Sequence, residues 1–291
     1  MTFHHLPPLL AHLASAGRHV LTYWHAATRA VGGALFQVQS QRDLFRVARR
    51  KGRFASTIRF RRLPGKTRGK PALLIHYHIF KNAGTSFEWA LEQALGKGFR
   101  SFDTSSPGGF ISGRNLREFA GRNPEVKAIS SHQAAPPAPG IPGRELVTSI
   151  LIRDPIARVR SIYAFERRQH ASSPGAVKAK ELNFKQYVEW RLETSPALLC
   201  NFQVHFCSRT EDNRMLAPGR EYLEEAIANL DTISIVGTVA RYGEWLALAQ
   251  KILSGLFPNV TLPFSRQNSN LGNDPSEAAI LEDVRAVNEF L

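Results

Sequence analysis

The sequence predicts an α/β fold in which a P-loop-like central parallel sheet carries helices on both faces and is preceded by a basic N-terminal extension. Three short apolar runs, at residues 73–80, 146–152 and 232–237, have the length and the branched or aromatic side chains of buried strands. Residues 100–122 are expected to form a surface loop followed by a short helix. Helical spacing of apolar residues predicts further helices at residues 183–193, 198–206, 222–230 and 239–253. This alternation of strand and helix is typical of a parallel sheet that is covered on both faces.

Charge divides the 291-residue chain near Lys70. Residues 1–70 contain 14 of the 38 Lys and Arg against one acidic residue, Asp43, whereas residues 71–291 carry 24 basic and 23 acidic side chains. We therefore expect a basic, partly helical or disordered extension over residues 1–70 and one folded domain over residues 71–291. Such an extension suits an anionic membrane surface or an acidic partner, with a solvated leader as the alternative. The near-neutral domain predicts no specific nucleic-acid partner.

Hydropathy and cysteine usage indicate where in the cell the protein is expected. No apolar stretch approaches the ~20 residues that span a bilayer, and the N-terminus lacks the pattern of a signal peptide. The two cysteines, Cys200 and Cys207, have the spacing of neither a disulfide framework nor a zinc site. We expect a cytoplasmic protein, membrane-peripheral if the extension binds lipid. The chain ends at Leu291 inside a predicted helix, which suggests a truncated C-terminus.

An anion-binding loop is predicted between the first strand and the first helix of the domain. The strand at residues 73–80 stops at Lys81, and Phe87, Leu91 and Leu95 then mark a helix that Gly96 ends. The first N–H groups of such a helix have no intrahelical acceptor, and the helix dipole favours negative charge there. Phosphate or sulfate therefore suits this loop. Its candidate binding residues are Lys81, Asn82, Ala83, Gly84, Thr85 and Ser86.

A second candidate phosphate site follows the strand at residues 146–152. Its sequence is RDPIARVRSIY, in which Asp154 is a natural N-cap and Pro155 suits the first helical position. Arg153 then stands at the end of the strand, and Ser161 lies about two turns into the helix. A guanidinium binds phosphate through two parallel hydrogen bonds, so Arg153 is suited to hold a phosphate, and Ser161 adds a hydroxyl on the following helix.

His132 is the candidate general base. It follows a short predicted strand at residues 126–130 and precedes a proline-rich loop. Ligands of parallel α/β sheets gather beyond the carboxyl ends of the strands, where His132 is expected to lie. An imidazole suits proton abstraction near neutral pH. We expect the remaining histidines of the domain to be structural, namely His76, His78, His170 and His205.

The motifs KxxGTS, from Lys81 to Ser86, and RDPxxRxxSxY, from Arg153 to Tyr163, resemble the two donor-binding motifs of sulfotransferases that use 3′-phosphoadenosine 5′-phosphosulfate (PAPS). The resemblance is closest to family 2, the carbohydrate group that includes heparan sulfate 2-O-sulfotransferase. It implies that the lysine loop holds the 5′-phosphosulfate, that Arg153 and Ser161 hold the 3′-phosphate, and that His132 is the catalytic histidine. No metal is implied.

The resemblance extends through most of residues 71–291. Asn201-Phe202-Gln203 is similar to the family's NxQ segment, residues 236–239 to its VGxTE segment, and residues 264–270 to the loop that closes over the donor. Val239-Ala240 stands where an acidic residue is common. Ser130 stands where the heparan 2-O enzymes have a second histidine, which puts a uronic-acid specificity in doubt.

The resemblance implies transfer of a sulfuryl group from PAPS to a hydroxyl, most simply on a saccharide, with adenosine 3′,5′-bisphosphate (PAP) as product. Lys81 would stabilise charge on the departing phosphate oxygen. A magnesium-dependent P-loop kinase or NTPase is one alternative, although the lysine comes before the turn instead of after it as in GxxxxGK[ST]. A non-catalytic adaptor that binds anions or membranes through residues 1–70 is the other. The acceptor and the oligomeric state are left open.

Overall fold

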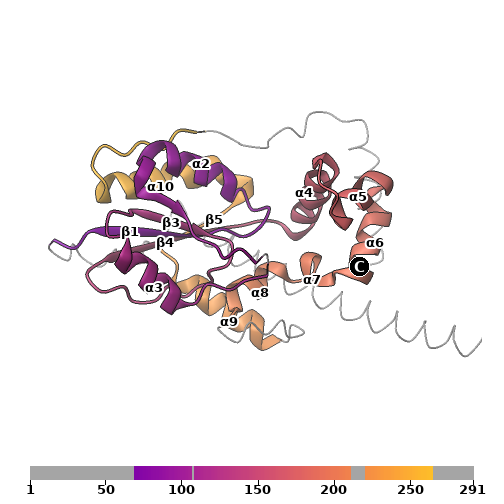
Figure 1. The fold of residues 1–291 in the computed structure, drawn as a ribbon, viewed down its shortest axis with the longest axis horizontal. Coiled ribbons are helices and arrows are strands. Elements are labelled where there is room, and N and C mark those ends of the chain that lie inside the picture. The colour runs from indigo at the N-terminus through magenta and orange to yellow at the C-terminus, as the bar shows by residue number, and fades with distance from the viewer. Residues whose placement is uncertain (1–68, 107, 211–219, 265–291) are drawn as a thin grey trace, which may run out of the picture.

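The computed structural model describes residues 69–106, 108–210 and 220–264 of the chain. Its centre is a five-stranded, all-parallel sheet in the order β2-β3-β1-β4-β5 (Figure 1), which confirms the predicted α/β, P-loop-like fold. The strands are β1 (Ala72–Tyr77), β2 (Phe99–Ser101), β3 (Ala128–Ser131), β4 (Glu145–Ile152) and β5 (Ile235–Thr238). Residues 1–68 of the predicted extension lie outside the described residues. The part of the predicted closing loop that follows Phe264 lies outside them as well.

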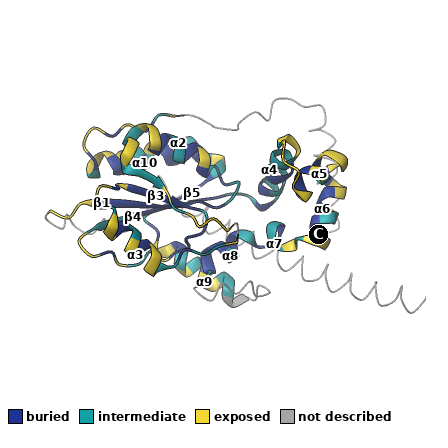
Figure 2. Ribbon diagram, viewed as in Figure 1, coloured by how far each residue is buried: buried dark blue, intermediate teal, exposed yellow. Residues whose placement is uncertain are grey.

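Helices cover both faces of the sheet (Figure 1). One face carries α2 (Gly84–Leu95) and α10 (Tyr242–Leu256), and the other carries α3 (Gly113–Arg122), α8 (Phe202–Ser208) and α9 (Arg220–Thr232). Successive residues of a strand point to opposite faces, so Leu74 of β1 packs with Phe87 and Trp245, whereas Ile75 packs in the core with Leu116 and Leu230. Figure 2 shows the buried residues along the strands and on the inner sides of these helices.

A separate helical group follows β4. It consists of α4 (Pro155–Arg168), α5 (Pro174–Glu181), α6 (Phe184–Thr194) and the short α7 (Pro196–Leu199), which share a small apolar core of their own. An ion pair between Glu166 and Arg191, 2.6 Å between oxygen and nitrogen, joins α4 to α6 within this group. Because α4 continues directly from β4, the group lies beside the carboxyl ends of the strands (Figure 1).

Local signals explain most element boundaries. The predicted N-cap Asp154 accepts a hydrogen bond from the Ala157 N–H, and Pro155 opens α4 as expected. Gly96 ends α2 with a positive φ of 50°, also as expected. Two predictions were wrong. Residues 100 and 101, within the segment predicted as loop, belong to the edge strand β2. The helix predicted over residues 198–206 is divided into α7 and α8 by Asn201, whose φ is 50°.

Among the described residues, no helix combines the length and the apolar character that are needed to cross a bilayer.

Candidate functional site

The loop between β1 and α2 has an unusual backbone. Lys81 and Ala83 both adopt left-handed φ values, 64° and 63°, which cost a non-glycine residue on the order of 1–2 kcal/mol each. Strain of this kind clusters at ligand-binding sites. Ala83 occupies the N-cap of α2 and makes no side-chain hydrogen bond to the helix. The first N–H groups of such a helix have no intrahelical acceptor, and this is the arrangement that binds anions at helix N-termini.

Cationic groups converge on this loop. The Lys81 Nζ lies 4.1 Å from the centre of the Phe165 ring of α4. Burial, together with the positive charges of Arg153 and Arg168, lowers the pKa of Lys81 to about 8. Like charges gathered in a partly buried place favour a negatively charged ligand, because an anion relieves their mutual repulsion.

Arg153 is bonded directly to the loop. Its Nη1 donates to the Lys81 carbonyl at 2.9 Å. The fully buried Gln203 of α8 completes the connection, because its side-chain oxygen accepts from the Asn82 Nδ2 at 2.7 Å and from the Arg153 backbone N–H at 2.9 Å. The Gln203 Nε2 also donates to the Arg153 carbonyl at 2.8 Å. Two motifs about seventy residues apart in the chain are thus fixed to each other, at the ends of the neighbouring strands β1 and β4.

The side chain of Asn82 serves the framework. Besides Gln203, its Nδ2 donates to the Leu151 carbonyl of β4 at 2.8 Å, and the residue is buried. A contribution of Asn82 to anion binding would therefore come from its main chain. Thr85 is exposed at the start of α2, whereas Gly84 and Ser86 are buried.

Helix α4 turns one face toward the loop. The buried Arg158 donates to the Phe80 carbonyl at 3.0 Å, and the Phe165 ring packs edge-on against the Phe80 ring at 5.7 Å. Ser161 lies between Arg158 and Phe165 at helical spacings of three and four residues, so it shares the face that both of them turn to the loop. The role of Ser161 as a phosphate ligand stays a prediction.

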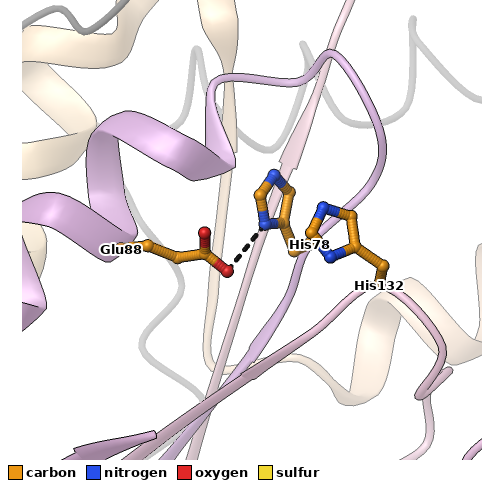
Figure 3. A group of neighbouring side chains, drawn as sticks. All are labelled: His78, Glu88 and His132. Carbon is orange, nitrogen blue, oxygen red and sulfur yellow. Dashed lines mark hydrogen bonds and ion pairs between the residues drawn. The ribbon is translucent and has the colours of Figure 1, made fainter. Parts of the chain in front are cut away.

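His132 stands at the end of β3, the strand on the other side of β1. Its Nδ1 lies 3.0 Å from the Asp103 Oδ2, and its side chain is 40% exposed. The His78 ring stacks on it, with ring centres 3.8 Å apart and planes 30° apart. Figure 3 shows His78 between His132 and Glu88, whose Oε1 lies 2.8 Å from the His78 Nδ1.

The charge states within this cluster follow from burial and hydrogen bonding. Burial lowers the pKa of His78 and outweighs the opposite effect of Glu88. Burial alone would raise the pKa of Glu88, but the hydrogen bond and charge of His78 bring it down to about 2. Glu88 is therefore an anion that accepts the His78 Nδ1–H. Gly84 connects the cluster to the loop, because a Cβ at that position would lie 2.0 Å from the His78 Cδ2.

A metal ion is one ligand to consider, since His78, Glu88 and His132 each have a possible ligand atom within 4.8 Å of the others. The lone pair with which an imidazole binds a metal lies in the plane of its ring. Two stacked rings direct these lone pairs past each other instead of toward a common point, and Glu88 is already engaged by His78. The geometry thus favours two stacked histidines, each hydrogen-bonded to a carboxylate, over a metal centre.

Three residues support His132 directly or through a neighbour without a distinguishing signal in the sequence. Asp103 lies in a loop that has no diagnostic pattern, Glu88 reads as an ordinary helix residue, and His78, expected to be structural, is buried and hydrogen-bonded to Glu88. Only their spatial relation to His132 distinguishes them, since the β2–β3 and β1–β3 pairings bring them to the end of β3. Gln203 was indicated by the NxQ resemblance alone.

Comparison with known proteins adds one distant relative. No family model matches the chain, and no solved structure matches it. An uncharacterized protein of Archaeoglobus fulgidus is 26% identical over 206 residues, which cover 69% of this chain and 81% of that protein. This similarity indicates common ancestry over most of the folded domain and carries no assignment of activity.

Proposed function

We propose that this protein is a sulfotransferase that moves a sulfuryl group from PAPS to a hydroxyl, with a saccharide as the favoured acceptor. The observation that carries the proposal is the link between Lys81 and Arg153, made by the carbonyl of Lys81 and by Gln203. The link holds two cationic elements side by side, which supports their use as two adjacent anion sites. A nucleotide with separate 5′ and 3′ anionic groups fits such a pair, with the 5′-phosphosulfate at residues 81–86 and the 3′-phosphate at Arg153 and Ser161.

The proposed reaction follows from these positions of the donor groups and from the position of His132. The acceptor oxygen attacks sulfur while the bond between sulfur and the 5′-phosphate oxygen breaks, and His132 takes the proton of the acceptor hydroxyl. Negative charge then grows on the departing phosphate oxygen. Lys81 and the N–H groups at the start of α2 stabilise that charge, and their effect is larger in the transition state than in the bound donor.

The charge of the site favours sulfuryl transfer over magnesium-dependent phosphoryl transfer. The groups around the loop are cationic, namely Lys81, Arg153 and Arg168. Asp154, next to Arg153, caps α4 with its side chain. A magnesium site beside a P-loop uses the Ser or Thr directly after the lysine together with a carboxylate. Here Asn82 follows Lys81, and its side chain is bonded to the Leu151 carbonyl and to Gln203.

The catalytic part of the proposal is tested with His132→Ala. Radiolabelled sulfate transfer from PAPS to a panel of saccharides should fall to background, while calorimetry should give a PAP affinity close to that of the unchanged protein. The control is His170→Ala, an exposed histidine beyond α4, which should retain activity. Full turnover by His132→Ala would refute the assignment of the base.

The donor part is tested with Arg153→Ala. PAP should bind more weakly by about 10- to 150-fold, the value of a hydrogen bond to a charged group, while AMP, which lacks the 3′-phosphate, should lose little. Arg114→Ala removes an exposed arginine of α3 and serves as the control for net charge. Equal losses for PAP and AMP would refute the 3′-phosphate role of Arg153.

A further inference from the structure

The two carboxylate oxygens of Asp103 have different partners. Three donors converge on its Oδ1: the Ser131 Oγ at 2.8 Å, the His132 N–H at 2.9 Å and the Gln133 N–H at 3.2 Å. The Oδ2 is left to the His132 ring, at 3.0 Å from Nδ1. This carboxylate is therefore held by the end of β3 through one oxygen and contacts the imidazole with the other.

We propose that Asp103 is a positioning residue that fixes His132 as the tautomer protonated at Nδ1, so that the Nε2 lone pair is the base. The inference rests on the proposed function of His132. A carboxylate can only accept hydrogen bonds, so an imidazole bonded to it through Nδ1 must carry its proton there. In the neutral ring, Nε2 is then the nitrogen that can take a proton from an acceptor hydroxyl.

The environment keeps Asp103 ionised and in place. Burial raises the pKa of Asp103, but the hydrogen bonds from His132 and Ser131 outweigh it, so the net pKa lies below the ordinary value. The loop that carries Asp103 is anchored by Gln133, whose Oε1 accepts from the Thr104 N–H at 2.7 Å and whose Nε2 donates to the Ser106 carbonyl at 2.7 Å.

Further contacts hold the ring and the backbone of His132. The His78 ring covers one face of it at 3.8 Å, and the Arg209 Nη2 donates to the His132 carbonyl at 3.1 Å. His78 cannot readily move away, because Glu88 holds its Nδ1 and Gly84 lies directly against its ring. His132 thus has a defined orientation as well as a defined tautomer.

The unequal use of the two oxygens gives a sharp test. In Asp103→Asn, the amide oxygen should stay at the Oδ1 position, because the Ser131 hydroxyl and the His132 N–H donate there and the Gln133 N–H is shared between this oxygen and the Ser131 Oγ. The amide NH₂ then occupies the Oδ2 position and donates to the His132 Nδ1, which forces the ring proton onto Nε2 and blocks the base. Asp103→Ala removes the constraint without imposing the wrong tautomer. A positioning role therefore predicts lower turnover for Asp103→Asn than for Asp103→Ala, and a purely structural role predicts the reverse order.

The experiment measures sulfate transfer, PAP affinity and the tautomer in the full chain. We expect Asp103→Asn to lower kcat by about 10²- to 10⁴-fold, the usual contribution of a general base, and Asp103→Ala to lower it less, with PAP affinity unchanged in both. The control Glu118→Gln, a carboxylate-to-amide change on the surface of α3, should leave kcat unchanged. Lower kcat in Asp103→Ala than in Asp103→Asn, or kcat equal to that of the unchanged protein in both, would overturn the inference.

Nuclear magnetic resonance of ¹⁵N-labelled histidine reads the tautomer without any activity. The His132 signal, assigned by its loss in His132→Ala, should show Nδ1–H in the unchanged protein and Nε2–H in Asp103→Asn. An Nε2–H tautomer in the unchanged protein would overturn the positioning role. Absence of sulfate transfer with every acceptor would count against the proposed function instead, and the spectra would still decide the role of Asp103.

Discussion

Replacing Gln203 with alanine tests whether the two anion-binding elements depend on each other. The change removes three buried hydrogen bonds, one to Asn82 and two to the backbone of Arg153. At about 1 kcal/mol each, the free energy of unfolding should fall by about 3 kcal/mol. For a folded domain of this size, Tm should fall by about 6–12 °C. The backbone at Arg153 would also lose its fixed position, and restoring it on binding costs about 1–2 kcal/mol, so PAP should bind about 5- to 30-fold more weakly.

Gln133 offers a matched control on the other side of β1. It is also buried, and it holds the loop at residues 104–106 with its side chain. Gln133→Ala should lower Tm by a similar amount and reduce kcat by disturbing Asp103, while PAP affinity stays unchanged. Thermal unfolding and calorimetry on both variants give the comparison. The reasoning fails if Gln203→Ala binds PAP as tightly as the unchanged protein, or if Gln133→Ala weakens PAP binding to the same extent.

Two further predictions concern the loop itself. Gly84→Ala should lower the free energy of unfolding by about 1–3 kcal/mol, because the new Cβ would lie 2.0 Å from the His78 ring. The control Gly121→Ala adds a Cβ in α3 where no described atom outside the local backbone lies within 4 Å, so it should be neutral or slightly stabilising. Chemical denaturation measures both variants, and equal effects would contradict the prediction. The pKa of Lys81 is lowered to about 8 by burial and by Arg153, and bound phosphate raises it again. PAP binding above pH 8 should therefore take up a proton, which calorimetry in buffers of different ionisation enthalpy detects; binding without proton uptake would contradict the placement of Lys81 beside the phosphate.

The same titration makes the ligand-free protein more stable as pH rises. The folded pKa of Lys81, about 8, lies below its ordinary value of 10.5, so between these two values the unfolded chain binds more protons than the folded protein. Stability therefore increases from about pH 8 to about pH 10.5 through this group. Bound PAP should weaken that increase.

The sequence allowed the central strands and the helix starts to be predicted because their signals are local. Strand β4 is predominantly apolar and branched, and α4 begins at an Asp-Pro pair that suits the N-cap and the first helical position. Strand β2 has three residues at the edge of the sheet, too few for a period of two to be recognised. The division between α7 and α8 depends on the left-handed backbone of Asn201, which side-chain periodicity does not encode.

The residues of the candidate site that lie within sequence motifs could be predicted, whereas the contacts between distant loops could not. Lys81 and Arg153 each follow a strand whose position was predictable, and the parallel sheet then brings them together. The contact between Asp103 and His132 joins residues 29 positions apart, one of them in a loop without periodicity. It depends on the register of β2 against β3, where the backbone N–H of Phe102 reaches the Ser130 carbonyl, and such long-range register has no local signature.

The most direct test of the central claim is the nucleotide preference of the unchanged protein, measured by calorimetry with and without magnesium. The proposed donor site predicts that PAP binds about 10- to 150-fold more tightly than AMP, and that magnesium is not needed. Tighter binding of ATP than of PAP, only in the presence of magnesium, would contradict the proposal and favour phosphoryl transfer.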